Sequence, residues 1–362
     1  MTATQLYPTP LVARAESAPD IIVAVEGLTK RFPVQRGWRS MFVRRGISAE
    51  YVQALDRVSL EIRRRELFGV LGPNGAGKTT LFKLLSTLIV PDGGTAIIAG
   101  HDLVRDPARV RTVLAPSIAD ERSLNWRVSA HENLRFYAAL YGLQGRSMRE
   151  RVGQVLETVE LAEAGGRMVG TFSSGMKQRL LIARALLPAP KVLLLDEPTR
   201  SLDPVAARRF RSFLREHLVA EQGCTVLLAT HNTEEALELC DRVAILDRGR
   251  VLEVGAAGKL SRELGGQRYR ARARRFEPSV IEILQGAGLI GEVQRREQLD
   301  GWEIVDFIVP GGDERAADVL AALVRQGTPL AGFEPLPVTL ADVIEQAVRR
   351  GQNSSREGGL GC

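Results

Sequence analysis

The sequence predicts an α/β fold followed by a smaller α+β region, and three patterns support this prediction. Unbroken apolar runs at 192–195 and 226–229 each end in polar residues, which is typical of buried parallel strands. The segment 206–219 between them has the apolar spacing of a crossover helix. Upstream, an apolar strand, a glycine-rich loop and a helix follow one another within 66–89. Strands that alternate with helices in this way indicate a parallel sheet.

The other elements of the first region follow from local patterns. Residues 21–28 (IIVAVEGL) have strand character, and a basic insertion at 33–53 interrupts them. The segment 52–72 then predicts a hairpin-like pair of strands that leads into the glycine-rich loop. Two further segments have apolar residues every three to four positions, 132–163 and 175–187. They predict a helical subdomain at about 120–188.

The pattern changes after residue 258, and from about Tyr269 a new series of elements begins. We expect a strand, a helix at 278–288, a strand pair within 291–309, a helix at 314–326, another strand, and a helix at 339–349. This predicts a first domain at 21–258 and a small α+β accessory domain at 259–349. The mixed Pro, Ala and Ser residues of 1–20 and the Gly/Ser-rich 350–362 predict disordered tails.

Composition narrows the functional class. The 362 residues are 44% hydrophobic and 25% charged, which excludes a wholly disordered or fibrous chain. Three scattered cysteines provide neither a disulfide framework nor a zinc site, which fits a reducing cytosol. No apolar run approaches the roughly 18 to 20 residues of a membrane-spanning helix, and the N-terminus lacks the pattern of a signal peptide. Any membrane involvement is therefore expected to need a second chain.

The glycine-rich loop is the strongest functional motif. The segment GPNGAGKTT matches G-x-x-x-x-G-K-[ST], and it lies between an apolar strand and a helix, as a phosphate-binding loop requires. Glycines let backbone N–H groups turn toward one anion, and the N-terminus of the following helix adds positive charge. Lys78 would bind the β- and γ-phosphates, and Thr79 would bind Mg²⁺. The predicted nucleotide-binding residues are Gly72, Pro73, Asn74, Gly75, Ala76, Gly77, Lys78, Thr79 and Thr80.

Three polar side chains end the two buried strands and complete a candidate hydrolytic site. Asp196 would hold the metal, and Glu197 would act as the general base toward water. His231 ends the second strand, at the edge of the sheet where it would share the crevice with the phosphate loop. There it would donate to the γ-phosphate or orient the water. A structural hydrogen-bonding role for His231 and a solvated acid pair are the alternatives.

The order of these motifs resembles that of the ATP-binding subunits of ABC transporters over about residues 21–255. The resemblance rests on the phosphate loop, a signature segment Phe172–Met176 (FSSGM), the acidic strand 192–197, the following loop 201–203 and His231. It implies a P-loop NTPase sandwich with a helical signature subdomain. Ser173, Ser174 and Gly175 open a helix, which makes them a second anion site. By resemblance they, with Asp203, would bind the γ-phosphate held by Lys78 of a second subunit.

Three positions test the detail of the resemblance. The signature usually reads LSGGQ, and here Met176 replaces the last, hydrogen-bonding residue. The family places a glutamine about where Asp120 falls, and Asp120 could reach the metal or water only as an acceptor. Phe32 lies where the family stacks an aromatic ring on adenine, and a core phenylalanine is the equal alternative.

The resemblance also implies cofactors and partners. It implies ATP and Mg²⁺, hydrolysis of ATP, a homodimer or heterodimer of ATP-binding subunits, and an integral-membrane permease that holds them at the cytoplasmic face of the inner membrane. The motif DERS-x-x-W-R at 120–127 resembles the sequences of the family branch that exports drugs, lipids or polysaccharides. The alternatives are an importer's ATPase and a soluble ABC ATPase that takes no part in transport.

The net charge of +6 is concentrated in one segment, since residues 30–65 hold ten basic and three acidic residues. In the insertion 33–53, arginines alternate with Trp38, Met41 and Phe42. A solvated excursion, a contact with anionic lipid headgroups, and nucleic-acid binding are the alternatives, and nucleic acid is the least expected because no accompanying motif is present. Four arginines alternate along 268–274, which predicts a solvated strand face.

Overall fold

The computed structural model describes the chain in several stretches, 20–33, 51–118, 123–200, 202–264, 267–297 and 301–336, with residues 342, 344 and 347. Asp120 and nearly all of the basic insertion lie outside the described residues. The chain divides into two compact units, 1–254 and 255–362. The sequence places this boundary at 258, a few residues further along.

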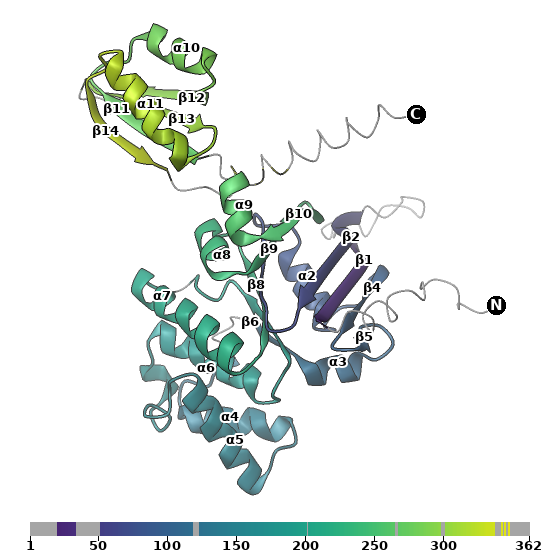
Figure 1. The fold of residues 1–362 in the computed structure, drawn as a ribbon. Helices are drawn as coiled ribbons and strands as arrows, with labels where there is room; N and C mark the ends of the chain where they lie inside the picture. Colours follow the sequence, from purple (N-terminus) through teal and green to yellow (C-terminus); the bar gives the residue numbers. More distant parts are fainter. Residues whose placement is uncertain are drawn as a thin grey trace, which may run out of the picture. The chain divides into compact units, whose positions relative to one another are not determined.

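The first sheet of unit 1 is antiparallel, with the order β2-β1-β4-β5 (Figure 1). Its strands are β1 (Ile21–Pro33), β2 (Tyr51–Arg63), β4 (Gly93–Ile98) and β5 (His101–Asp102). The hairpin predicted within 52–72 is wrong, because β2 pairs with β1 and the next strand, β3 (Leu67–Leu71), enters the other sheet. The reason is that the end of β2 alternates buried and exposed residues, whereas β3 is buried throughout.

The second sheet of unit 1 has six strands in the order β10-β9-β3-β8-β7-β6 (Figure 1). Besides β3 these are β6 (Leu114–Ile118), β7 (Val192–Asp196), β8 (Thr225–Thr230), β9 (Arg242–Asp247) and β10 (Arg250–Ala256). The strands β6, β7, β8, β3 and β9 pair in parallel. Their carboxyl ends therefore meet at one edge, which confirms the predicted sheet and brings the candidate site residues together.

Helices surround this sheet. Helix α2 (Lys78–Leu85) is buried between the two sheets, where Leu81 and Leu84 join a core built from both. The crossover between β7 and β8 is α7 (Pro204–Phe213), which continues as a π-helix at Leu214–Glu221. The other helices beside the sheet are α3 (Pro107–Val113) and α8 (Thr233–Leu239).

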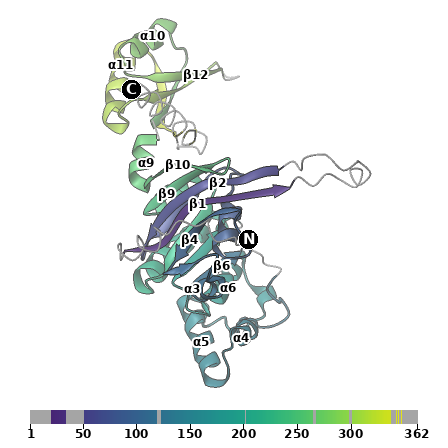
Figure 2. The same cartoon turned by 90° about the vertical axis from the view of Figure 1, so that its right-hand side faces the viewer.

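The predicted helical subdomain is present and extends from one end of unit 1 (Figure 2). It contains α4 (Ala130–Leu140), α5 (Gly145–Thr158), a short 3₁₀ turn at Val169–Thr171, and α6 (Ser174–Leu186). Helix α4 begins with a capping box, in which Ser129 Oγ accepts from the Glu132 N–H and Glu132 accepts from the Ser129 N–H. The described helices include none that is long and apolar enough to cross a bilayer.

Unit 2 begins within β10 and continues with α9 (Ala257–Leu264), after which a four-stranded antiparallel sheet has the order β12-β13-β11-β14. Its elements are β11 (Gln267–Ala273), α10 (Pro278–Gly286), β12 (Gly291–Glu297), β13 (Glu303–Val309), α11 (Asp313–Arg325) and β14 (Leu330–Pro335). Helices α10 and α11 pack on one face of this sheet, over a core that includes Tyr269 and Phe307. Only residues 342, 344 and 347 of the helix predicted at 339–349 are described, and they are helical.

The opposite face of this sheet carries the arginines that were predicted to be solvated, of which Arg272 and Arg274 are exposed and Arg268 and Arg270 are half-buried. Arg270 Nε and Nη2 donate to Asp306 Oδ1 and Oδ2 at 2.8 and 2.9 Å, and Asp306 is 4% exposed. Arg272 and Arg274 lie over the ring of Trp302, at 5.4 and 5.7 Å from its centroid. These arginines therefore have acidic or aromatic partners, which the folded sheet brings close from segments that are distant in sequence.

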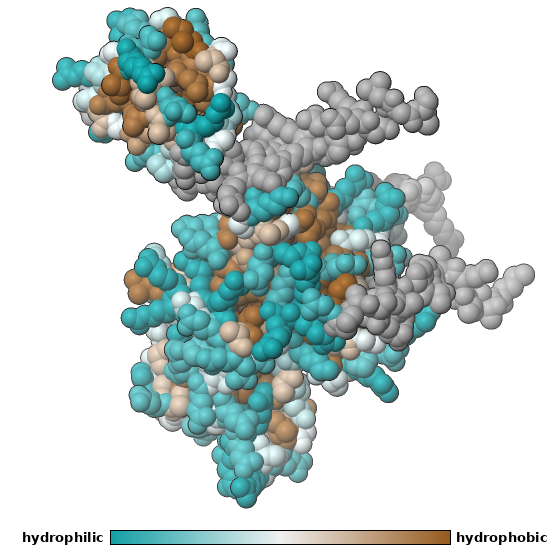
Figure 3. Space-filling view, in the orientation of Figure 1, coloured by the Kyte–Doolittle hydropathy of each residue, from teal (hydrophilic) through white to brown (hydrophobic). Residues whose placement is uncertain are grey.

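The surface on the side shown in Figure 3 is mostly hydrophilic in unit 1, with hydrophobic residues scattered over it. Exposed apolar side chains of unit 2 include Ile283 of α10 and Val324 of α11, which are 51% and 58% exposed.

Candidate functional site

The phosphate loop connects β3 to α2 and is held close to the sheet. Gly72 N–H donates to the Thr230 carbonyl, and a Cβ at Gly72 would lie 2.2 Å from the Leu246 carbonyl oxygen. Gly77 has φ +109, and a Cβ there would meet the Ala54 carbonyl oxygen at 2.5 Å. Only glycine fits at these two positions, so the motif is required by packing as well as by phosphate binding.

Lys78 is the first residue of α2 and is 6% exposed. Its Nζ donates to the carbonyl oxygens of Gly72 and Pro73 at 2.7 and 3.1 Å, which fixes the ammonium group over the loop. Burial lowers the pKa of Lys78, and the nearby carboxylates of Glu197 and Asp196 oppose this shift. An anionic phosphate in the loop would provide the ammonium with a charged partner in place of two neutral carbonyls.

Thr79 and Asp196 form the next part of the site. Thr79 Oγ1 donates to Asp196 Oδ2 at 2.8 Å, although the two residues belong to α2 and β7. Burial raises the pKa of Asp196, the hydrogen bond from Thr79 opposes this shift, and the charge of Glu197 adds to it. A hydroxyl and a carboxylate side by side are hard oxygen donors, and this donor set fits Mg²⁺.

Glu197 lies directly beyond the end of β7 in a left-handed conformation with φ 47, which is uncommon for a residue with a side chain. Its Oε1 lies 2.8 Å from Nδ1 of His231, which follows β8. Its Oε2 lies 3.5 Å from Nη1 of Arg200. The side chain of Glu197 is 16% exposed, so the carboxylate is held between these two partners at the edge of the sheet.

A buried hydrogen-bond network around Glu235 fixes the end of β8, next to His231. Glu235 of α8 is 1% exposed and accepts hydrogen bonds from the hydroxyls of Thr199 and Thr230, at 2.5 and 2.7 Å. Thr230 precedes His231, and Asn232 caps α8 by accepting from the Glu235 N–H. Glu235 therefore connects the loop after Glu197 to the strand end that carries His231.

The phosphate loop, Asp196 and Glu197 border one cavity of about 620 Å³, whereas His231 and Glu235 are not among the residues that line it. Its lining includes Asn74, Gly75, Gly77, Lys78, Thr79, Thr80, Asp196 and Glu197, together with Val52, Gln53, Ala54, Gln178, Pro198 and Arg200. Sequence reasoning missed Gln178, Arg200 and Glu235. An asparagine three residues before Glu235 was an available signal for a helix start, whereas nothing local in the sequence singles out the other two.

Phe32 lies beside this cavity and is not among the residues that line it. It is 38% exposed, and Lys30 Nζ lies 5.6 Å from its ring centroid. Phe32 is opposite Val52 in the pairing of β1 with β2, so the two side chains share a face of the sheet. Val52 lines the cavity, and a stacking role for Phe32 stays a prediction.

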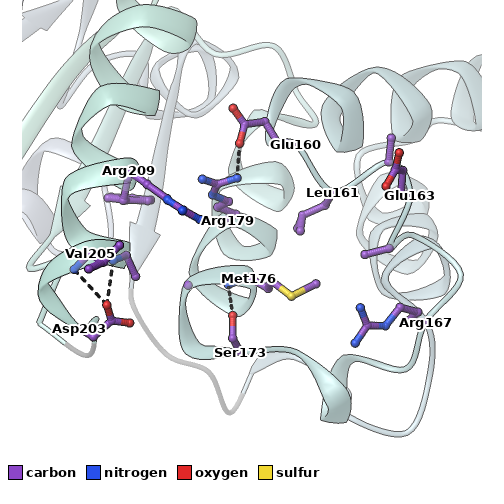
Figure 4. Close-up of a pocket in the computed structure, with 15 residues that line it drawn as sticks. Glu160, Leu161, Glu163, Arg167, Ser173, Met176, Arg179, Asp203, Val205 and Arg209 are labelled. Carbon is purple, nitrogen blue, oxygen red and sulfur yellow. Dashed lines mark hydrogen bonds and ion pairs between the residues drawn. The ribbon is translucent and has the colours of Figure 1, made fainter.

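The signature residues lie elsewhere in unit 1. Ser173, Gly175 and Asp203 border a second cavity of about 790 Å³ together with Arg167, Arg179 and Arg209 (Figure 4). Ser173 Oγ caps α6 by accepting from the Met176 N–H, and Asp203 caps α7 by accepting from the N–H groups of Val205 and Ala206. In Figure 4, Arg179 is paired with Glu160 and extends toward Arg209.

A single chain thus has two separate groups of predicted site residues. The phosphate loop, Asp196 and Glu197 share the first cavity, and His231 joins them through Glu197. The residues that line the second cavity do not include Lys78 or Thr79. The structure does not bring the signature residues to the phosphate loop of their own chain.

Comparison with known proteins shows the family of the chain. The family model described as ABC transporter matches residues 55–200. A daunorubicin resistance ATP-binding protein, DrrA3 of Streptomyces coeruleorubidus, is 41% identical over 246 residues, 67% of this chain and 77% of that protein. The chain belongs to the ATP-binding proteins of ABC transporters.

A second relative of this ATP-binding protein is the doxorubicin resistance ATP-binding protein DrrA of Mycobacterium tuberculosis, which is 40% identical over 62% of this chain and 66% of its own length. Among solved structures, cbiO1 of Clostridium perfringens, part of the transporter complex cbiONQ, has a TM-score of 0.58 and 27% identity, covering 67% of this chain and 92% of that one. The cassette MJ0796, a dimer bound to ADP and phosphate, has a TM-score of 0.54 and 25% identity, covering 65% and 98%. These findings confirm the predicted fold and an ATP hydrolase.

Proposed function

We propose that this chain hydrolyses Mg-ATP between two ATP-binding subunits and drives the export of a drug-like molecule through a separate membrane permease. The single observation that carries the proposal is the cavity in which Lys78, Thr79, Asp196 and Glu197 meet, with His231 on the Glu197 carboxylate. Thr79 and Asp196 would hold Mg²⁺, which supplies positive charge to the phosphate oxygens.

Other residues of the chain bind the phosphates and activate the water. Lys78 binds the β- and γ-phosphates, and the N–H groups of the loop and of α2 surround them. Glu197 accepts a proton from the attacking water. Its carboxylate is held in place by the hydrogen bond with His231 Nδ1, and it lines the same cavity as the phosphate loop. His231 fixes the position of that carboxylate and would also contact the γ-phosphate.

Two copies are needed because the signature residues border a different cavity from the phosphate loop. Ser173, Gly175 and Asp203 would complete the phosphate loop of a second subunit, as a homodimer or a heterodimer. The dimeric cassette MJ0796 with ADP and phosphate supports this arrangement. ATP then stabilises the closed dimer, and loss of the γ-phosphate removes contacts that favour it.

The names of the relatives support the cargo and the direction. Two are ATP-binding proteins of daunorubicin or doxorubicin resistance, which fits removal of a drug from the cell. We propose that a permease holds the chain at the cytoplasmic face of the inner membrane. The basic insertion 33–53 lies mostly outside the described residues, and contact with anionic lipid stays its proposed role.

The test compares the purified chain with Glu197→Gln, which keeps the size of the side chain and removes the base. We expect turnover of Mg-ATP to fall about 10²-fold or more, while ATP binding persists and the variant becomes dimeric with ATP on size-exclusion chromatography. Glu157→Gln, at an exposed position of α5, is the matched control and should behave like wild type. Normal turnover in Glu197→Gln would overturn the assignment of the base, and a monomer at saturating ATP would overturn the dimer.

A further inference from the structure

The cavity of the phosphate loop contains a polar group to which no role has been given. Within the described part of the chain, three buried side-chain atoms have no hydrogen-bond partner: Ser117 Oγ, Gln178 Nε2 and Thr233 Oγ1. Only Gln178 belongs to a residue that lines this cavity. Gln178 is 7% exposed, so its N–H groups are turned away from bulk solvent. A buried donor without an acceptor is uncommon in a folded protein and indicates a ligand or a functional role.

The helix that carries Gln178 explains how the side chain reaches this cavity. Met176 and Arg179, three positions apart on one face of α6, border the other cavity. Successive residues of an α-helix are rotated by about 100°, so Gln178 lies on a different face. It lines the first cavity together with Asp196, the last residue of β7, and Glu197 and Pro198, which follow that strand.

The neighbouring carboxylates already have donors of their own. Asp196 Oδ2 accepts from Thr79, and the two oxygens of Glu197 face His231 and Arg200. An amide Nε2 can only donate. An acceptor that enters the cavity for the reaction would satisfy this donor, and the water activated by Glu197 is an acceptor that must come close to this carboxylate.

We infer that Gln178 is a further catalytic residue, whose Nε2–H donates to the oxygen of the attacking water. This inference rests on the proposed role of Glu197. One lone pair of the water oxygen attacks the γ-phosphorus while the other accepts from Gln178, and one water proton passes to Glu197. The bond between the γ-phosphorus and the bridging oxygen breaks, and its electron pair leaves with ADP. The amide thereby fixes the direction of the attacking lone pair.

The test uses the purified chain with Gln178→Met, which has a similar size and no amide, and Gln178→Glu, which keeps the shape and replaces the donor with an acceptor. We expect kcat for ATP to fall at least about tenfold in both variants, with KM for ATP unchanged. The melting temperature of nucleotide-free Gln178→Met should not fall, because the Nε2 that the substitution removes has no hydrogen-bond partner.

Asn133→Leu is the matched control for a purely structural amide. Asn133 is 4% exposed, and its Nδ2 donates to the carbonyl oxygens of Asn125 and Ser129. This variant should melt at a lower temperature and keep kcat per folded molecule. A wild-type kcat in Gln178→Met overturns the inference, as does a loss of activity that follows a lowered melting temperature in both Gln178 variants. If Glu197→Gln is inactive while both Gln178 variants are normal, the proposed function stands and this inference fails. A wild-type chain without ATPase activity overturns both.

Discussion

Glu235 offers the sharpest test of how the site is held together. Its buried carboxylate accepts from two hydroxyls, those of Thr199 and Thr230. Hydrogen bonds to a charged group contribute about 1.5 to 3 kcal/mol each. We expect Glu235→Ala, which leaves both hydroxyls without this acceptor, to lower the free energy of unfolding by about 3 to 5 kcal/mol. A domain of this size would then melt roughly 6 to 20 °C lower.

Thermal unfolding followed by circular dichroism, with ATPase activity measured below the transition, checks this prediction. Glu235→Gln should lose less stability than Glu235→Ala, since hydroxyls can reorient toward an amide. Glu234→Ala is the control, because Glu234 is the exposed neighbour on the same helix, and a surface change of this kind shifts stability by about 0.5 kcal/mol or less. Equal melting temperatures for Glu235→Ala and Glu234→Ala would refute the reasoning.

Two further predictions concern charged groups. Arg270→Ala leaves the buried Asp306 carboxylate without its bidentate partner, so the free energy of unfolding of unit 2, measured by urea denaturation, should fall by about 3 kcal/mol. The control is Arg275→Ala, which removes an exposed ion pair and should cost less than about 1 kcal/mol. Equal losses in the two variants would contradict the assignment. Burial lowers the pKa of Lys78, so its ammonium loses its proton at a lower pH than an ordinary lysine. ATP affinity, measured by titration calorimetry, should therefore weaken as pH rises through that lowered pKa, and Lys78→Arg should shift the loss to higher pH; identical profiles would count against the explanation.

The elements predicted best are those whose signal is local. The phosphate loop has its own spacing, and glycines at 72 and 77 are needed where backbone carbonyls approach closely. The elements α10, β12, β13 and α11 of unit 2 lie within a few residues of their predicted bounds, because each has a clear period and glycine or proline residues separate them. The polar residues that end the two apolar runs marked the strand ends equally clearly, and this placed Asp196, Glu197 and His231 at one edge of the sheet.

The errors concern partners that are distant in sequence. Nothing in 52–72 states that β2 pairs with β1 across the basic insertion while β3 joins another sheet. The arginines of β11 had an exposed pattern, and Asp306, the acceptor of Arg270, is on a strand that only the folded sheet brings near. Gln178 lies in a helix whose apolar period predicts packing alone, and its place in the cavity depends on how α6 meets the segment after β7.

The left-handed backbone of Glu197 has a consequence for evolution and engineering. A side chain in this conformation costs roughly 1 to 2 kcal/mol, and glycine would avoid that cost. Selection for thermal stability alone would therefore favour glycine at 197. With Glu197 as the proposed general base, such a variant would be more stable and would lose ATPase activity, so the proposal ties the carboxylate at this turn to selection for ATP turnover.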